Sequence, residues 1–345
     1  MKYLVACSIL ILLVIASVFF INQQEDGNVV EWKLLTGTET SHLPEDSRPD
    51  LLSFSNVAFF EESKGIAITT VSIERSSDGG KSWTTDTKMG DYAFYSLKLI
   101  DQKRGFIVGK DRENNPVIWK SEDQGIHWLK MDLTGAGLDK VKKEFSVFYD
   151  VCFDSEKRGL VVGNGGAVEI GLDGQNMRLD RVFSTAQPLY SVSCGTSQAT
   201  WAMGIKNLYR RSGSWEEIKF GFEDGEFTKV ISNDGGTWLL GTRRSTTGET
   251  LQGITLRSRD NGKIWEDIDS KIGKPVNDIY IHEKVGWLVG WGGVIYYTRD
   301  NGETWTKSAS PSKNSLDNIF FLDPTHGWIS GANLTVLRMV QQQEL

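Results

Sequence analysis

The chain has 345 residues, of which 39% are hydrophobic and 24% charged, with 36 glycines, 12 tryptophans and 7 prolines. This composition is that of an ordinary globular β protein, and a single all-β domain can reach this length. Because the formal net charge is −7, the sequence argues against a polyanionic partner, and we expect no binding to nucleic acid.

Residues 1–24 differ from the rest of the chain. Lys2 precedes an uncharged apolar stretch at residues 4–21, and Glu25 and Asp26 follow it. The length lies at the border between a signal peptide and a membrane-spanning helix. Because the positive charge stands before the stretch, the N-terminus should stay in the cytoplasm while the remainder is exported. We predict an apolar helix that is a signal peptide or signal anchor, leaving the protein membrane-anchored or periplasmic or extracellular.

A repeated unit of four short strands follows. Its second strand combines a small or polar residue with an apolar run, as in Gly105-Phe106-Ile107-Val108-Gly109. Seven such strands occur, beginning at Gly65, Gly105, Gly159, Thr200, Gly236, Gly286 and Gly327. Short strands at even spacing with turn residues between them are typical of an all-β fold, and the repeat predicts one unit copied around an array.

The two ends of the chain complete one unit. The last copy stops near Met339 after its third strand, while residues 29–35, around Trp32, resemble the fourth strands of the other units. Joining them would close the array and remove two exposed sheet edges. We therefore predict an all-β, seven-bladed β-propeller of four-stranded antiparallel blades spanning residues 29–339, with one blade shared between the ends. The predicted blades are 51–88, 91–133, 143–183, 186–220, 226–270, 274–309, and 315–339 together with 29–36.

Four units carry the phrase Ser/Thr-x-Asp-x-Gly-x-x-Trp between the third and fourth strands. Its Ser/Thr and Asp side chains can bond nearby backbone N–H groups, and its Gly supplies a positive φ, so we expect a structural hairpin. Each copy offers one carboxylate, too few for a calcium loop, and we predict no metal or cofactor. The residues are Ser76, Asp78, Gly80, Trp83, Ser121, Asp123, Gly125, Trp128, Ser258, Asp260, Gly262, Trp265, Thr298, Asp300, Gly302 and Trp305.

Two cysteines, Cys152 and Cys194, lie in the body of the chain. Alignment of their repeats pairs Cys152 with Ser193 and Cys194 with Phe153, so the two side chains should point to opposite faces of equivalent strands. An exported protein can pair its cysteines, but this alignment favours two separate buried thiols.

The repeated phrase is the Asp-box, or bacterial neuraminidase repeat. The fuller unit, seen in residues 286–305 and in Phe320-Phe321-Leu322-Asp323 before Gly327-Trp328, resembles the photosystem II assembly and stability factor family. The resemblance implies an exported, non-catalytic propeller that binds a protein partner during assembly of a membrane complex. Sialidases share the box and imply a glycosidase or sugar-binding propeller, but the chain lacks their Arg-Ile-Pro phrase. The four histidines, His42, His127, His282 and His326, show neither metal-ligand spacing nor a catalytic triad.

In a propeller, the second-to-third strand loops lie on the face opposite the boxes. On that face we expect a basic group on an otherwise acidic protein, together with an aromatic ring. Arginine can hold a carboxylate in a bidentate manner, so an acidic or C-terminal peptide segment of a membrane protein is the expected partner of a monomeric propeller. The alternatives are solvated loop charges and a ring that simply packs. The candidate binding residues are Lys110, Arg112, Lys206, Arg243, Arg244 and Trp291.

Overall fold

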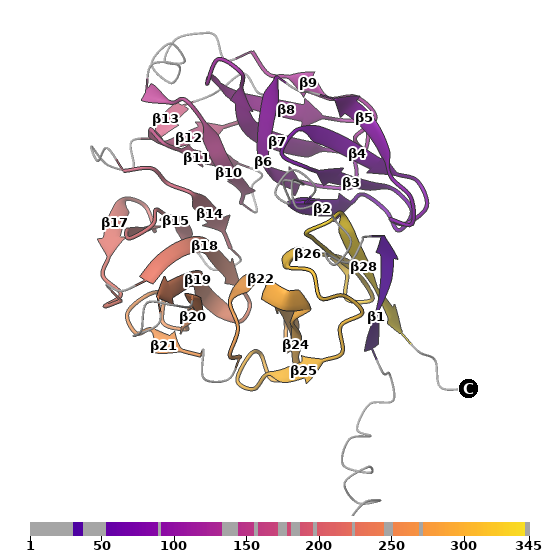
Figure 1. The fold of residues 1–345 in the computed structure, drawn as a ribbon. Coiled ribbons are helices and arrows are strands. Elements are labelled where there is room, and N and C mark those ends of the chain that lie inside the picture. The colour runs from indigo at the N-terminus through magenta and orange to yellow at the C-terminus, as the bar shows by residue number, and fades with distance from the viewer. Residues whose placement is uncertain are drawn as a thin grey trace, which may run out of the picture.

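The computed structural model describes residues 30–36, 53–88, 91–132, 144–154, 158–171, 178–180, 187–195, 199–222, 225–244, 251–268 and 272–341. They form seven four-stranded antiparallel sheets arranged in a ring (Figure 1). The predicted seven-bladed propeller is confirmed, whereas the helix expected in residues 1–24 lies outside the described residues. Within the described ranges, no helix is long and apolar enough to cross a membrane.

The blades are numbered here in chain order from Asn56. Blade 1 consists of β2 Asn56–Phe59, β3 Gly65–Ile68, β4 Ser72–Ser76 and β5 Thr84–Lys88. Blade 2 consists of β6 Tyr92–Leu99, β7 Gly105–Asp111, β8 Pro116–Ser121 and β9 Leu129–Lys130. Blade 3 consists of β10 Phe148–Phe153, β11 Gly159–Gly163, β12 Gly166–Ile170 and β13 Arg178–Asp180. Blade 4 consists of β14 Ser191–Cys194, β15 Thr200–Met203, β16 Leu208–Arg211 and β17 Trp215–Ile218. Blade 5 consists of β18 Gly225–Asn233, β19 Gly236–Arg244, β20 Leu251–Ser258 and β21 Glu266–Asp267. Blade 6 is β22 Val276–His282, β23 Val285–Gly290, β24 Ile295–Thr298 and β25 Thr306–Ser308, with the short 3-10 helix η4 Trp291–Gly293 after β23. Blade 7 is β26 Leu316–Asp323, β27 His326–Gly331, β28 Thr335–Gln341 and β1 Val30–Thr36.

Strand β1 closes the ring as expected. It pairs antiparallel with β28, and Trp32 lies opposite Met339. The buried Trp32 ring makes edge contacts with Trp287 at 6.3 Å and Phe321 at 6.2 Å between ring centroids. The pairing joins the two ends of the described chain through backbone bonds and leaves no open sheet edge between the first and last blades.

The first strand of a blade is its innermost strand, and it carries a bulge in blades 2, 3, 5, 6 and 7. In blade 2, for example, Tyr95 has no partner on β7 because Phe94 pairs with Gly109 and Ser96 with Val108. The bulge presses the carbonyl group of the first strand against the second strand. A Cβ atom at Gly109 would lie only 2.0 Å from the Ala93 carbonyl oxygen, so this position requires glycine.

A polar or charged residue follows the bulge in these five blades and occupies the equivalent position in blades 1 and 4, and together these residues form an inter-blade belt. Each links its blade to the next around the ring, as Ser96 does by donating to Asp150 at 2.7 Å. Asn318 closes the circle by accepting the N–H of Val57 in blade 1 at 3.1 Å. The members of the inter-blade belt are Asn56, Ser96, Asp150, Ser191, Lys229, Asp278 and Asn318.

The four Asp-boxes hold their own hairpins. In the first, Asp78 Oδ1 accepts the N–H of Ser82 at 2.9 Å, and the Ser76 hydroxyl accepts the N–H of Gly80 at 2.8 Å. Hydrogen bonds from the hydroxyl and N–H of Ser82 lower the pKa of Asp78 to about 2. Gly80 has φ 93°, which a side chain would make unfavourable. The boxes that begin at Ser121, Ser258 and Thr298 repeat these bonds.

Arginines of the third strands fasten neighbouring blades at the box end. The Arg257 guanidinium lies 4.8 Å from the centre of the Trp238 ring, and it donates to the carbonyl oxygen of Asn301 in the next blade's box. Arg210 lies over Trp201 in the same way and donates to the carbonyl oxygen of Asn261. These arginines therefore have a structural role, and their presence in several blades does not indicate a sialidase triad.

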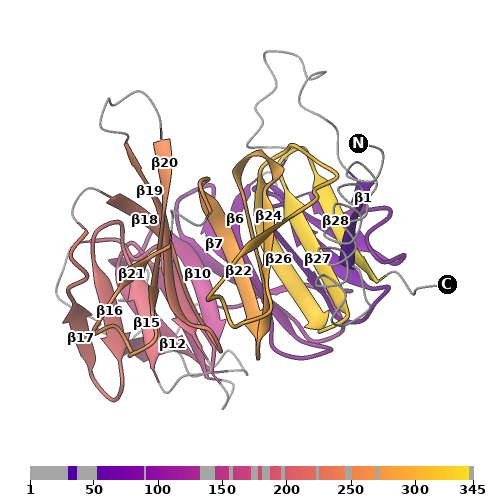
Figure 2. The ribbon, with the colours of Figure 1, turned by 90° about the horizontal axis from the view of Figure 1, so that it is seen from below.

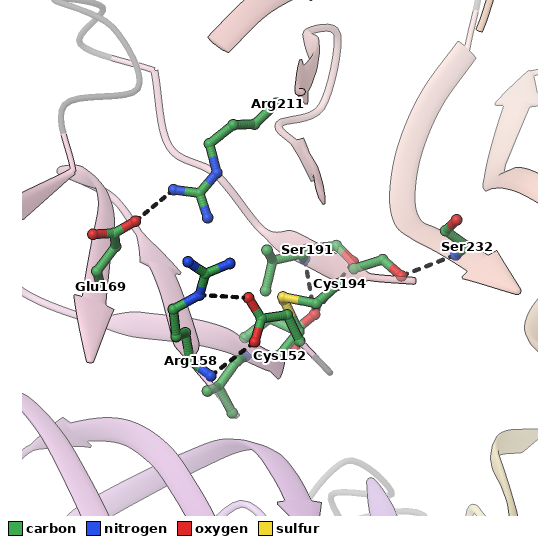
Figure 3. Close-up of a disulfide and its surroundings, with 12 residues drawn as sticks. Cys152, Arg158, Glu169, Ser191, Cys194, Arg211 and Ser232 are labelled. Carbon is green, nitrogen blue, oxygen red and sulfur yellow. Dashed lines mark hydrogen bonds and ion pairs between the residues drawn. A yellow bond between two sulfur atoms is a disulfide. The ribbon is translucent and has the colours of Figure 1, made fainter. Parts of the chain in front are cut away.

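The expectation of two separate thiols is wrong, because Cys152 and Cys194 form a disulfide with a Cα–Cα distance of 5.5 Å (Figure 3). Cys152 packs in the cluster between blades 3 and 4, which Cys194 also contacts. The alignment did place the two side chains on opposite faces of equivalent strands. In a ring, however, one face of each blade packs against the opposite face of the next, so that arrangement brings the sulfurs together. The ion pair of Arg211 with Glu169, at 2.7 Å, crosses the same junction.

Candidate functional site

The propeller has two unlike faces. The face that carries the Asp-boxes also carries the turns between first and second strands, and we name it the box face. Its acidic side chains bond their own turns: Asp101 accepts the N–H groups of Lys103 and Arg104, at 2.9 and 2.8 Å. Burial would raise the pKa of Asp101, but the bonds from Arg104 and these N–H groups lower it to about 2. The opposite face, named the open face, carries the second-to-third strand loops.

Blade 5 extends beyond its neighbours on the open face. Its strands β18, β19 and β20 have 9, 9 and 8 residues, whereas the corresponding strands of blade 4 have 4 each. Figure 2 shows β19 and β20 reaching further toward this face than β15 and β16 of blade 4. Arg243 and Arg244 lie in this projection, paired with Gln252 and Leu251. The length of the hairpin therefore raises two predicted site residues above the rest of the face.

Trp291 lies in the tight loop after β23. The backbone N–H of Trp291 donates to the carbonyl oxygen of Pro275 at 3.0 Å, and Gly292 and Gly293 adopt φ values of 67° and 72°. Gly293 also lies so close to Ser312 that a Cβ atom would be 2.0 Å from its carbonyl oxygen. This loop leaves the indole 40% exposed. The ring is therefore available for stacking against a ligand.

Arg243 and Trp291 line one groove between blades 5 and 6, with a volume of about 830 Å³. Lys274 adds a second cation to it, and Leu251, 47% exposed, adds an apolar surface. We call it the blade 5–6 groove. Lys274 and Leu251 were not predicted as site residues, although Leu251 belongs to the long blade 5 hairpin and Lys274 to the connection that follows blade 5. The residues that line the groove are Arg243, Leu251, Gln252, Gly253, Asp267, Gly273, Lys274, Pro275, Trp291 and Gly292.

The other predicted binding residues lie elsewhere on the open face. Lys206 lines a separate groove of about 400 Å³ with Lys219 and Phe220. Lys110 and Arg112 belong to blade 2, where Lys110 donates to Asn114 at 2.9 Å and Arg112 pairs with Asp91 at 3.2 Å. The predicted basic group is therefore divided among separate blades, because loops that are equivalent in the repeat occupy different positions around the ring.

The described residues contain no group of three or more His, Cys, Asp and Glu side chains that could hold a metal ion. Three of the four histidines lie in turns beside an acidic residue: His127 at 2.7 Å from Asp123, His282 at 3.2 Å from Asp234, and His326 at 2.8 Å from Asp323. His42 lies outside the described residues. The acids beside these histidines belong to the turns of the box face.

The ring of sheets and the repeated boxes define the chain as a seven-bladed propeller of the Asp-box class. No protein-family model matches it. A photosystem II stability/assembly factor, HCF136 of Arabidopsis thaliana, is 23% identical over 358 residues, which cover 91% of this chain and 80% of the relative. The chain is homologous to these factors. HCF136 of Guillardia theta is 31% identical over 118 residues, covering 31% of this chain and 28% of the relative.

Solved structures share the fold. YCF48 bound to a D1 peptide has a TM-score of 0.66 at 17% identity, covering 92% of this chain and 98% of that chain. A xyloglucanase from Xanthomonas campestris has a TM-score of 0.63 at 13% identity, covering 90% of this chain but 53% of that chain. Identities this low show the fold alone. The homology to stability/assembly factors supports the expectation of a non-catalytic binding protein over that of a glycosidase.

Proposed function

We propose that the protein is an exported assembly or stability factor that holds an acidic or C-terminal peptide segment of a membrane protein in the blade 5–6 groove. The observation that carries the proposal is the meeting of Arg243, Lys274 and the exposed Trp291 in one groove. The two cations suit a carboxylate, and the indole and Leu251 suit apolar side chains of an extended peptide. The homology to stability/assembly factors and the D1 peptide bound to YCF48 support a peptide as the ligand.

A photocrosslinking amino acid at position 251 is expected to capture the partner in intact cells. Leu251 is 47% exposed in the groove, so a reactive side chain there would meet a bound peptide. The matched control is position 264, because Ile264 is 72% exposed in the box of the same blade, on the other face. Mass spectrometry of the crosslinked products would identify the partner.

Reversal of charge at Arg243 and Arg244 to Glu should reduce the yield of the position 251 crosslink by about 30-fold or more, since a hot-spot residue is worth about 2 kcal/mol or more. The control variant Lys263→Glu changes an exposed cation on the box face and should leave the crosslink intact. Equal crosslinking from positions 251 and 264, or a yield that survives the double reversal, would refute the groove as the partner site.

Export is the second part of the proposal. The Cys152–Cys194 disulfide supports it, because disulfides persist in oxidising compartments and are rare in the cytosol. Cells lysed in acid and treated with a thiol-alkylating reagent are expected to yield protein in which these two cysteines are unmodified unless reductant is added first. The variant Cys7→Ser removes the remaining cysteine and makes the assay unambiguous. Complete alkylation of both cysteines without reductant would contradict export.

A further inference from the structure

Three tyrosines form an arc around the axis of the propeller. Tyr95 and Tyr149 lie at the bulges of β6 and β10, and Tyr190 directly precedes β14. The first strands of successive blades surround the axis (Figure 1). The ring centroids of Tyr95 and Tyr149 are 5.5 Å apart with an interplanar angle of 67°, and those of Tyr149 and Tyr190 are 4.8 Å apart at 40°. The rings therefore follow one another around the centre from blade 2 to blade 4.

The residues that flank each bulge point to the neighbouring blades. The tyrosine at the bulge therefore points toward the propeller axis. In blade 2, Phe94 packs in the cluster shared with blade 1, and Ser96 donates to Asp150 of blade 3. Tyr95 and Tyr149 are half-buried, and burial raises the pKa of both phenols. The arc consequently presents neutral rings. It lies near the beginning of the first strands, which is their end on the open face.

A carboxylate occupies the corresponding position across the axis. Asp317, at the bulge of β26, accepts hydrogen bonds from Ser53 at 2.9 Å, Ser315 at 3.1 Å and Asn277 at 3.1 Å. These bonds fix the direction of the carboxylate. Because blade 3 stands opposite blades 6 and 7 in the ring, Asp317 and Asn277 lie across the axis from Tyr149.

The charges around the arc are mainly negative. Asp150 is held by the N–H of Val192 at 3.0 Å and by the hydroxyl of Ser96, whereas Asp278 pairs with Lys229 at 2.8 Å. Asp150, Asp278 and Asp317 thus place three carboxylates, and Lys229 one ammonium group, among the first strands that surround the axis. An acidic surround and several aromatic rings are the combination that binds organic cations, through cation–π attraction and a counter-charge.

We propose that the open-face end of the propeller axis binds an alkylammonium group, with Tyr149 as the central cation–π surface and Asp317 as the counter-charge. The ammonium group would come from a lysine side chain or from a chain N-terminus. This site is separate from the blade 5–6 groove, which presents cations and suits an anionic group. A partner that presents both charges could engage both sites.

Calorimetric titration of the purified full chain tests the site with small probes. Nα-acetyl-lysine methylamide carries a side-chain ammonium, alanine methylamide carries an α-ammonium, and Nα-acetyl-norleucine methylamide is the neutral analogue. We expect at least one of the two ammonium probes to bind and the neutral analogue not to bind. The tighter of the two ammonium probes identifies the source of the cation. Failure of both, or equal binding of the neutral analogue, would overturn the proposal.

Paired variants locate the binding. Tyr149→Phe keeps the ring and should retain affinity within about threefold, whereas Tyr149→Leu should weaken it about 10-fold, the equivalent of one cation–π contact. Asp317→Asn should also weaken binding. Tyr297→Leu, a partly buried tyrosine on the third strand of blade 6, is the control and should leave binding unchanged. Unchanged affinity in Tyr149→Leu with an unchanged melting temperature refutes the site. The Arg243 and Arg244 reversals should not affect these probes, so the two proposals fail independently.

Discussion

Replacement of Asp278 by Ala is expected to lower the free energy of unfolding by about 3–5 kcal/mol, the range for breaking a buried ion pair from one side. Asp278 is 6% exposed, and its carboxylate pairs with Lys229 of blade 5 at 2.8 Å. It also accepts the N–H of Ile319 at 3.0 Å and the side-chain amide of Asn318 at 2.9 Å, both in blade 7. One side chain therefore joins three blades, and its loss leaves a cation and a buried N–H group without acceptors.

Denaturant unfolding under non-reducing conditions measures this effect. The control is Asp91→Ala, which removes an exposed ion pair with Arg112 and should change the free energy of unfolding by less than about 1 kcal/mol. The double variant Lys229→Met/Asp278→Leu should recover part of the loss, because it removes the unpaired buried charge. A single Asp278→Ala variant within about 1 kcal/mol of the wild type would show that the inter-blade belt contributes little.

The architecture could be predicted because its determinants are local. The number of second strands, each a small residue followed by an apolar run, gives the number of blades. The absence of a fourth strand after Met339 indicates that the strand around Trp32 closes the last blade. Each of these features repeats, so a copy supports the interpretation of the others. The Asp-box phrase likewise satisfies its own hydrogen bonds within a few residues.

What the sequence did not predict depends on contacts between blades. The disulfide followed from face-to-face packing around the ring, which an alignment of equivalent strands does not contain. The bulges did leave a signal, since Gly109 of the second strand lies against the carbonyl group of Ala93 in the bulged first strand, and Gly290 lies against that of Pro275, directly before the bulged strand β22. That signal would have identified Tyr95 and its equivalents as axial residues.

The candidate site was predicted in part for the same reason. Arg243 and Trp291 come from consecutive blades, so their loops meet in one groove. Arg112 occupies a similar loop but belongs to blade 2, where it pairs with Asp91. Position in the repeat predicts the face on which a residue lies, whereas its neighbours on that face depend on which blades are adjacent.

Replacement of Arg257 by Ala should lower the free energy of unfolding by about 3 kcal/mol, combining a desolvated cation–π contact with the loss of hydrogen bonds to buried carbonyl groups. Arg257 is 2% exposed; Nε donates to the Gly235 carbonyl oxygen at 2.8 Å, and the guanidinium lies over Trp238 and donates to Asn301 of blade 6. Arg257→Lys should recover less than half of the loss, because an ammonium group cannot reach two carbonyl groups and the ring face together.

The neighbouring residue Arg259 provides the matched control for Arg257. Its side chain is 46% exposed, and it pairs with Glu303 at 2.6 Å and Glu266 at 3.6 Å, so Arg259→Ala should change the free energy of unfolding by less than about 1 kcal/mol. Amide hydrogen exchange should show faster opening of Arg257→Ala where the boxes of blades 5 and 6 meet before it does elsewhere. Equal losses of unfolding free energy in Arg257→Ala and Arg259→Ala would mean that Arg257 acts through its charge alone. Uniformly faster hydrogen exchange in Arg257→Ala would mean that Arg257 does not hold blades 5 and 6 together at their boxes.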